Sequence, residues 1–335
     1  MYCALSDEGY DSVYLGKKSK YTFPLLDATM KKRLTSLVFA PVFFIIASLV
    51  LSIAITIYKV TPPAYAQTNA VALTNTTPLA VNNSTAAITE GLHVNKEVKY
   101  FDNASGYLVY PSTAATPTAN SSNAATGKKL PAVIMIHENR GINDNIRSMA
   151  RTLAKQAGYV VLAVDLFKGQ STTDPNQAAL LVKTVRDNPQ EAISNLQAGV
   201  KYVSSIPFVN ASKIASLGWC FGGGQSLQLA LHSEQHPLAA TVLYYGTPLV
   251  TDKQALSNIK WPVLGIFGDH DQANPLPLIN TFKAALDKSA VTNEILIYKG
   301  LGHAFANPSG ANYAPQQTAD AWQKTLTFLS KYLNH

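Results

Sequence analysis

Cysteine is scarce in this chain. Only Cys3 and Cys220 occur among its 335 residues, and two cysteines cannot form the disulfide framework of a small stapled protein. Charge is scarce as well, at 14% of residues against roughly 25% in ordinary soluble domains. Beyond residue 66 the basic excess is 20 − 16 = 4 and forms no stripe or patch. This charge distribution excludes a typical nucleic-acid-binding protein.

One long stretch near the beginning has no charge at all. Residues 34–57 are rich in Leu, Ile, Val and Phe, and a run of about 20 apolar residues is long enough to cross a bilayer. Lys31, Lys32 and Arg33 directly precede it, which predicts that this flank stays in the cytoplasm. We therefore expect residues 1–66 to be a cytoplasmic tail followed by a signal helix.

The fate of this helix is left open by the residues that follow it. Ala64-Tyr65-Ala66 has the small-x-small form of a signal-peptidase site, but the apolar run is longer than most signal peptides have. Cleavage after Ala66 would release a secreted protein, and an uncleaved signal anchor would tether it to the outer face of the cytoplasmic membrane through residues 34–57. In both cases we expect the body of the protein to be exported.

A low-complexity segment separates this region from the rest of the chain. Residues 67–92 are mainly Thr, Asn, Ala and Pro with almost no charge, a composition typical of a disordered linker. A second such piece, residues 112–129, is expected to form a loop. Asn-x-Ser/Thr triplets, where glycosylation is possible in a competent host, begin at Asn75, Asn82, Asn83, Asn103, Asn120 and Asn210.

From residue 93 onward the pattern becomes one of alternating strands and helices. Continuous apolar runs of strand length, separated by helical segments, indicate a mainly parallel sheet with helices on both faces. The strands are expected at 94–101 and 106–110, which form an opening hairpin, and at 132–136, 160–164, 214–217, 241–245, 263–267 and 295–298. The helices are expected at 144–157, 176–204 with a break at Pro189, 222–232, 278–286 and 315–332. In such sheets functional residues gather at the carboxyl ends of the strands.

A glycine-rich turn follows the strand predicted at 214–217. Gly218-Trp219-Cys220-Phe221-Gly222 has the Gly-x-nucleophile-x-Gly spacing of a nucleophile elbow, with cysteine in place of serine. The turn is so tight that side chains two positions on either side would clash, and the helix N-terminus beneath it favours a thiolate. The alternative is a buried structural cysteine.

Two further strand ends carry a histidine and a pair of acids. His303 lies in a loop after the last predicted strand, downstream of Cys220, as the base does in the chain order of α/β hydrolases. Asp269 and Asp271 follow the strand at 263–267, where an acid could orient the histidine. We predict that Asp271 has this role and that Asp269 serves the turn.

A fourth strand end, after residue 136, carries the sequence His137-Glu138-Asn139-Arg140-Gly141. In an α/β-hydrolase scaffold this loop supplies one backbone N–H of the oxyanion hole, and the residue after the nucleophile supplies the other. Those donors would be the N–H groups of Asn139 and Phe221. Glu138 is a carboxylate at a position where the turn does not require an acid. The alternative interpretation is that Glu138 is a solvated acid paired with Arg140.

Taken together, these residues resemble the dienelactone hydrolase family of α/β hydrolases over about residues 93–335. The resemblance rests on Gly218–Gly223, His137-Glu138 with Gly141, Val164-Asp165-Leu166-Phe167, Asp271 and Gly302-His303-Ala304-Phe305. It implies an α/β-hydrolase fold, with Cys220 as nucleophile, His303 as base and Asp271 as its orienting acid. It also implies that Glu138 hydrogen-bonds the resting thiol and takes its proton when substrate binds.

The function that follows is hydrolysis of small-molecule esters or lactones through a Cys–His–Asp triad. We expect a monomer that uses no cofactor, no metal and no nucleic-acid partner. Two alternatives are a non-catalytic surface-binding protein on the same fold and an acyltransferase that uses the same acyl-enzyme.

In one respect the chain departs from the family. Members that act on dienelactone hold the substrate carboxylate with arginines, one of them four residues after the catalytic histidine, where this chain has Asn307. Another would fall at 176–183, where the chain has no arginine. Neutral esters are therefore expected to be substrates at least as good as carboxylate-bearing lactones.

The two fates of the signal helix can be told apart by N-terminal analysis. If Ala64-Tyr65-Ala66 is cleaved, protein recovered from the host should begin near Gln67, as read by mass spectrometry. Peptides from residues 1–33 still joined to the catalytic domain would show instead that the anchor is retained.

Overall fold

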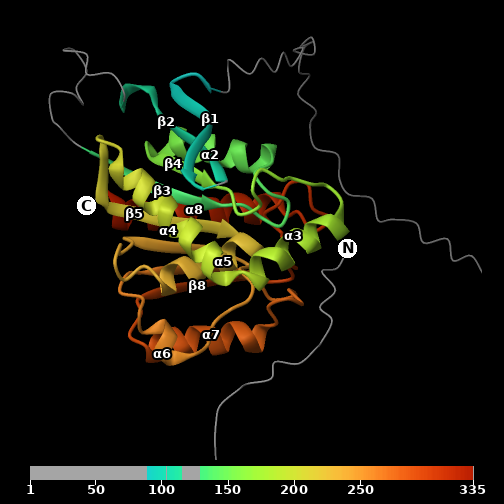
Figure 1. Ribbon diagram of the computed structural model, residues 1–335. Helices are drawn as coiled ribbons and strands as arrows, with labels where there is room; N and C mark the ends of the chain where they lie inside the picture. Colours follow the sequence, from blue (N-terminus) through green and yellow to red (C-terminus); the bar gives the residue numbers. More distant parts are fainter. Residues whose placement is uncertain (1–88, 103, 115–128, 335) are drawn as a thin grey trace, which may run out of the picture. The chain divides into compact units, whose positions relative to one another are not determined.

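The computed structural model describes residues 89–102, 104–114 and 129–334, which fall within one compact unit (Figure 1). The predicted signal helix, its cleavage site and nearly all of the linker lie outside these residues. Among the described residues, no helix combines the length and apolarity needed to cross a membrane. The first strand begins at Leu92, one residue before the predicted domain boundary.

A single sheet of eight strands organises the described residues. Its strands are β1 (Leu92–Phe101), β2 (Ala104–Pro111), β3 (Leu130–Ile136), β4 (Val160–Val164), β5 (Val209–Trp219), β6 (Ala240–Tyr244), β7 (Val263–Gly268) and β8 (Asn293–Tyr298). The order across the sheet is β1-β2-β4-β3-β5-β6-β7-β8. The β1–β2 hairpin and the β2–β4 pair are antiparallel, and every other pair is parallel. The predicted hairpin and mainly parallel sheet are thus confirmed.

Helices cover both faces of this sheet. They are α2 (Asp144–Ala157), α3 (Pro175–Asp187), α4 (Pro189–Ser205), α5 (Phe221–Leu231), α6 (Lys253–Leu256), α7 (Leu276–Lys288) and α8 (Pro315–Leu333). Buried side chains of α3 to α7 share one apolar cluster, and those of α2 and α8 share the other, with α4 and α5 in front of the sheet and α8 behind it in Figure 1. The central strands are buried on both faces, which explains their continuous apolar runs.

Local signals account for most helix boundaries. In α2, Ile146, Ala150, Leu153 and Ala154 recur at helical spacing on the buried face. The Asn143 side chain accepts the Ile146 N–H at the start, and Gly158 ends the helix with φ of 74°. The predicted break at Pro189 is also present, since α3 and α4 are separate helices that meet at Asn188. The short helices α6 and η1 (Ser112–Ala114) were not predicted, because neither is long enough to show a period.

A small polar network ties α5 to the sheet beneath it. The Ser226 hydroxyl of α5 lies 2.8 Å from that of Ser216 in β5 and donates to the Val242 carbonyl of β6. Thr241 accepts from the Trp261 indole N–H at 2.9 Å and lies 3.2 Å from Ser216. These groups are buried, so each hydrogen bond avoids the cost of an unsatisfied polar group. The network holds α5, the helix that directly follows Cys220, against the sheet.

Candidate active site

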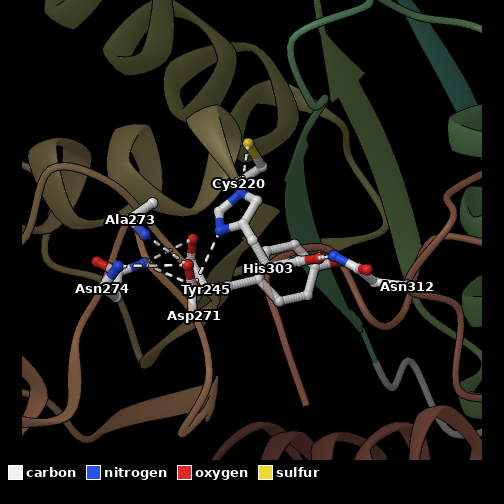
Figure 2. A network of polar contacts seen from close by, with 7 residues as sticks. All are labelled: Cys220, Tyr245, Asp271, Ala273, Asn274, His303 and Asn312. Atoms are coloured by element: carbon white, nitrogen blue, oxygen red, sulfur yellow. Dashed lines mark hydrogen bonds and ion pairs between the residues drawn. The ribbon is translucent and has the colours of Figure 1, made fainter. Parts of the chain in front are cut away.

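The predicted site residues meet at the carboxyl edge of the sheet. Cys220 follows β5, Asp271 lies three residues after β7, and His303 lies in the loop between β8 and α8. Figure 2 shows the three side chains in a line, with the histidine between the sulfur and the carboxylate. Glu138 and Asn139 follow β3, the strand beside β5.

Cys220 occupies a strained turn between β5 and α5. Its φ is 54° and its ψ is −119°, a backbone region that side-chain-bearing residues rarely adopt. A β-carbon at Gly218 would collide with the carbonyl oxygen of Gly222, so the turn can close only with glycine there. The Cys220 N–H donates to the Tyr244 carbonyl at 3.0 Å, which joins the turn to β6. These contacts have the geometry of a nucleophile elbow.

Gly222 brings the elbow against the end of β3. A β-carbon at this position would collide with the carbonyl oxygens of Ile136 and His137. The close approach sets the Phe221 N–H, in the first turn of α5, near the loop that contains Asn139. Neither of these N–H groups is used by another hydrogen bond within the described residues. The two predicted oxyanion donors are therefore on neighbouring segments and available.

His303 connects the sulfur to the carboxylate. Its Nε2 lies 3.1 Å from Cys220 Sγ and its Nδ1 lies 2.9 Å from Asp271 Oδ2. The Asn312 amide donates to the His303 carbonyl at 2.9 Å, and the Tyr245 ring meets the imidazole edge-on at 5.1 Å between centroids. The histidine is thus held through its backbone, its ring and both ring nitrogens.

Asp271 is fixed and kept ionised by a set of donors. Its Oδ1 accepts the Ala273 N–H at 2.8 Å, and its Oδ2 accepts the Asn274 side-chain amide at 3.2 Å as well as the His303 contact. Burial alone would raise its pKa, but the hydrogen bonds from His303, Asn274 and Ala273 outweigh burial and hold the pKa of Asp271 below its usual value. A hydrogen bond to a charged group is worth roughly 1.5–3 kcal/mol.

The choice between the two aspartates agrees with these contacts. Within the described residues Asp269 forms no hydrogen bond or ion pair with His303, and it accepts the Gly300 N–H at 2.6 Å. It therefore braces the loop that leads to His303, as predicted for a residue that serves the turn.

The charges at the site favour a protonated histidine. Burial lowers the pKa of His303, but its hydrogen bonds to Asp271 and Cys220 outweigh burial and raise the pKa to about 10. Burial, together with the nearby Glu138 and Cys220, also holds the pKa of Tyr245 well above its usual value. Tyr245 thus remains a neutral phenol beside the imidazole.

Glu138 differs from the prediction in its contacts. Its side chain is 5% exposed, and Oε2 accepts the Asn307 amide at 2.7 Å. Within the described residues Glu138 makes no hydrogen bond to Cys220, whose Sγ contacts His303 Nε2 instead. The expected contact between Glu138 and the resting thiol is therefore absent from this structure, because Asn307 takes one carboxyl oxygen and the imidazole takes the sulfur.

The alternative interpretation of Glu138 as a solvated acid paired with Arg140 is wrong. The Arg140 guanidinium donates to the Thr173 carbonyl at 2.8 Å, and Glu138 is buried. Burial raises the pKa of Glu138 to about 7, against the opposing charges of His303 and Arg140. This carboxyl group can accordingly exchange a proton near neutral pH.

Sequence reasoning missed several residues that hold the site. Tyr245, Asn274 and Asn312 were not predicted, and Asn307 was noted only as a replaced arginine. Asn274 and Asn312 lie in loops without periodicity, so only the folded chain reveals their partners. Tyr245 is the last residue of the strand predicted at 241–245 and directly follows β6, a strand-end position that could have been considered.

A separate small cavity lies away from the triad. It has a volume of about 80 Å³ and is bounded by residues of the β1–β2 turn, the 166–170 turn, α3 and α4, including Phe167, Lys168 and Asn195. Neither Cys220 nor His303 lines it. Within the described residues, no group of three or more His, Cys, Asp or Glu side chains is arranged to hold a metal ion.

The raised pKa of His303 makes a prediction about stability. A group whose pKa rises from 6.5 to about 10 on folding stabilises the fold fully below pH 6.5, and its contribution is lost as the pH rises through about 10. The free energy of unfolding of the wild type minus that of His303→Gln should therefore fall over this range. Urea unfolding at several pH values measures it, with the exposed His232→Gln as control. A difference that stays level or grows with pH would contradict the prediction.

Comparisons with known proteins identify the family of this chain. The family model described as "Dienelactone hydrolase family" matches residues 116–333. A protein of Saccharolobus solfataricus named as a carboxymethylenebutenolidase is 31% identical over 240 residues, which cover 60% of this chain and 89% of that protein. Protein usf of Aquifex pyrophilus is 30% identical over 211 residues, which cover 61% of this chain and 89% of that protein.

Solved structures show the same fold. A dienelactone hydrolase-like promiscuous phosphotriesterase from metagenomic libraries aligns with a TM-score of 0.63 and 22% identity, over 72% of this chain and 99% of that one. A dienelactone hydrolase from Anabaena variabilis aligns with a TM-score of 0.52 and 20% identity, over 72% and 99%. With the family match over residues 116–333, the conclusion is that this chain is an α/β hydrolase of the dienelactone hydrolase family.

Proposed function

We propose that this protein hydrolyses carboxylic esters or lactones through a covalent intermediate on Cys220. The observation that carries the proposal is the line of contacts from Cys220 Sγ to His303 Nε2 at 3.1 Å and from His303 Nδ1 to Asp271 Oδ2 at 2.9 Å. A nucleophile, a base in hydrogen-bond reach and a group that orients the base are the elements of a catalytic triad. The names of the relatives, which refer to carboxymethylenebutenolidase, support an ester or lactone substrate.

In the first half of the proposed reaction, the thiolate of Cys220 attacks the substrate carbonyl carbon. The carbonyl π electrons move to the oxygen, which accepts hydrogen bonds from the Asn139 and Phe221 N–H groups. The intermediate then collapses, the C–O bond of the ester breaks, and the leaving alkoxide takes the proton from His303 Nε2. Removing one such oxyanion donor typically costs about 10²–10³ in rate.

The second half releases the acid. His303 accepts a proton from water as the hydroxide attacks the thioester carbonyl, and collapse of this second intermediate expels the thiolate. Asp271 stabilises the His303 imidazolium, which is present at the start of the first half and forms again in the second, and holds Nδ1 in place. Where the thiol starts neutral, Glu138, which has a pKa of about 7, is proposed to accept its proton as substrate binds and to return that proton to the thiolate after the acid has left.

The proposal extends to cellular location. The uncharged run at 34–57 and the basic residues before it support export of the catalytic domain, whether the signal helix is cleaved or retained.

Substitution of Cys220 tests the nucleophile. Cys220→Ala should fold normally and lose hydrolysis of an aryl ester, and Cys220→Ser should keep at most weak activity. A thiol, with an ordinary pKa of about 8.5, is ionised by a neighbouring base far more readily than a serine hydroxyl. Iodoacetamide should inactivate the wild type, and substrate should protect it. Full turnover by Cys220→Ala, or by the alkylated enzyme, would remove Cys220 from the mechanism.

Substrate charge provides a second test. Asn307 donates its amide to Glu138 and brings no positive charge, so neutral esters should react at least as fast as lactones that carry a carboxylate. Loss of a charge-assisted contact costs roughly 1.5–3 kcal/mol, about ten- to a hundredfold in binding. A competition assay with a neutral and an anionic lactone measures the preference.

A strong preference for the anionic lactone would show that another cation binds it. Lys168 is paired with Glu191 at 2.6 Å and lines the separate cavity, so Arg140, whose charge acts on Glu138, is the first candidate. Arg140→Gln should then abolish the preference, and Arg147→Gln, which removes a surface arginine paired with Asp144, should not.

A further inference from the structure

His137 is a fully buried histidine that the proposed mechanism does not use. His137 is 0% exposed, and its imidazole packs against two phenyl rings that also contact each other, at 4.5 Å from Phe167 and 5.9 Å from Phe221 between centroids. Both ring nitrogens have backbone partners. Nδ1 lies 2.6 Å from the carbonyl oxygen of Glu138, and Nε2 lies 3.1 Å from the N–H of Leu166.

These two partners determine where the imidazole carries its proton. A backbone N–H can only donate, so Nε2 must present its lone pair to Leu166. The proton of the neutral ring is then on Nδ1, which donates to the Glu138 carbonyl. Burial lowers the pKa of His137 against the opposing influence of the Glu138 carbonyl and Asp165, which agrees with a neutral ring.

The carbonyl that His137 holds belongs to the peptide that carries a predicted oxyanion donor. The C=O of Glu138 and the N–H of Asn139 are parts of one planar unit and point in opposite directions. A hydrogen bond that fixes the direction of the Glu138 carbonyl therefore also fixes the opposite direction of the Asn139 N–H within this plane.

The Leu166 N–H, which donates to Nε2 of His137, is also held in a fixed turn. Leu166 lies in a turn whose Asp165 carboxylate accepts the N–H groups of Phe167 and Gly169. The Asp165 N–H donates to the Tyr100 hydroxyl at 2.8 Å, and its carbonyl accepts the Asn195 amide at 2.9 Å. The Leu166 N–H thus has a fixed position against which the imidazole is set.

We propose that His137 is a positioning residue that aims the Asn139 N–H at the oxyanion through the Glu138 carbonyl. The proposal rests on the proposed function. It assigns to the histidine of the His137-Glu138 pair a role that does not depend on proton transfer to substrate.

Two conservative variants separate the two hydrogen bonds of the ring. The side-chain amide nitrogen of asparagine comes nearest to the place of Nδ1 and can donate to Glu138, whereas the amide oxygen of glutamine reaches the place of Nε2 and can accept from Leu166. His137→Asn should retain more ester hydrolysis than His137→Gln. His137→Phe, which keeps the ring and loses both bonds, should reduce kcat about ten- to a hundredfold with little change in KM.

Two further measurements distinguish an aimed N–H from general support of the fold. Alkylation of Cys220 by iodoacetamide forms no oxyanion, so its rate should be the same in all three variants and the wild type. Benzaldehyde adds to the thiolate, its carbonyl π electrons move to oxygen, and the resulting alkoxide occupies the oxyanion position. The affinity of the enzyme for benzaldehyde should therefore be lower in His137→Gln and His137→Phe than in the wild type. His232→Phe is the matched control, because His232 also contacts a backbone carbonyl, that of Gln228 at 2.9 Å, but is exposed.

The outcomes separate this proposal from the proposed function. A wild type that hydrolyses no ester but binds benzaldehyde would refute the function and leave the positioning role testable by affinity. Equal or greater activity in His137→Gln than in His137→Asn, or alkylation that slows in step with hydrolysis, would overturn the positioning role. So would ¹⁵N NMR of the labelled histidines that shows His137 protonated on Nε2, and this measurement needs no variant.

Discussion

The tight turn at Cys220 is the constraint on which the site depends. With φ of 54°, the cysteine stands at a corner where β5 passes directly into α5, and the glycines around it permit backbone contacts that a β-carbon would block. One of these contacts, at Gly222, brings the elbow against the end of β3. Cys220 and the loop that contains Asn139 are therefore placed by the same close approach, and the polar network of Ser216, Ser226 and Thr241 holds the helix in that position.

Local patterns in the sequence were sufficient for most of the fold. Helix α2 has its cap, its apolar spacing and its terminating glycine within one short segment, and the prediction of residues 144–157 matches its bounds. The contacts among Cys220, His303 and Asp271 could also be anticipated, because each follows a strand and the carboxyl ends of parallel strands meet at one edge. Where a motif is short and its backbone demands are strict, as in Gly218–Gly222, the residues alone indicate the geometry.

The side-chain partners of Glu138 and His137 could not be predicted in the same way. Glu138 meets Asn307 across 169 positions of the chain, and His137 meets Leu166 across 29. Such pairings depend on how two loops are packed, and nothing in either loop specifies the other. The family resemblance suggested a thiol partner for Glu138, but the loop that brings Asn307 beside it provides a different one. The position of a residue at the end of a strand is thus easier to predict than its side-chain hydrogen-bond partners.

The long separation within the triad also has a consequence for synthesis. Cys220 precedes His303 by 83 residues, and at roughly 5–20 residues per second the ribosome completes the proposed nucleophile about 4 to 17 s before its proposed base. At the start of that interval neither β8 nor the loop that carries the imidazole exists, and until its end the elbow has no His303 beside it. In the proposed mechanism, reactivity toward substrate is therefore acquired only when the last fifth of the polypeptide has docked, and a chain that stalls earlier bears a Cys220 thiol without His303 beside it.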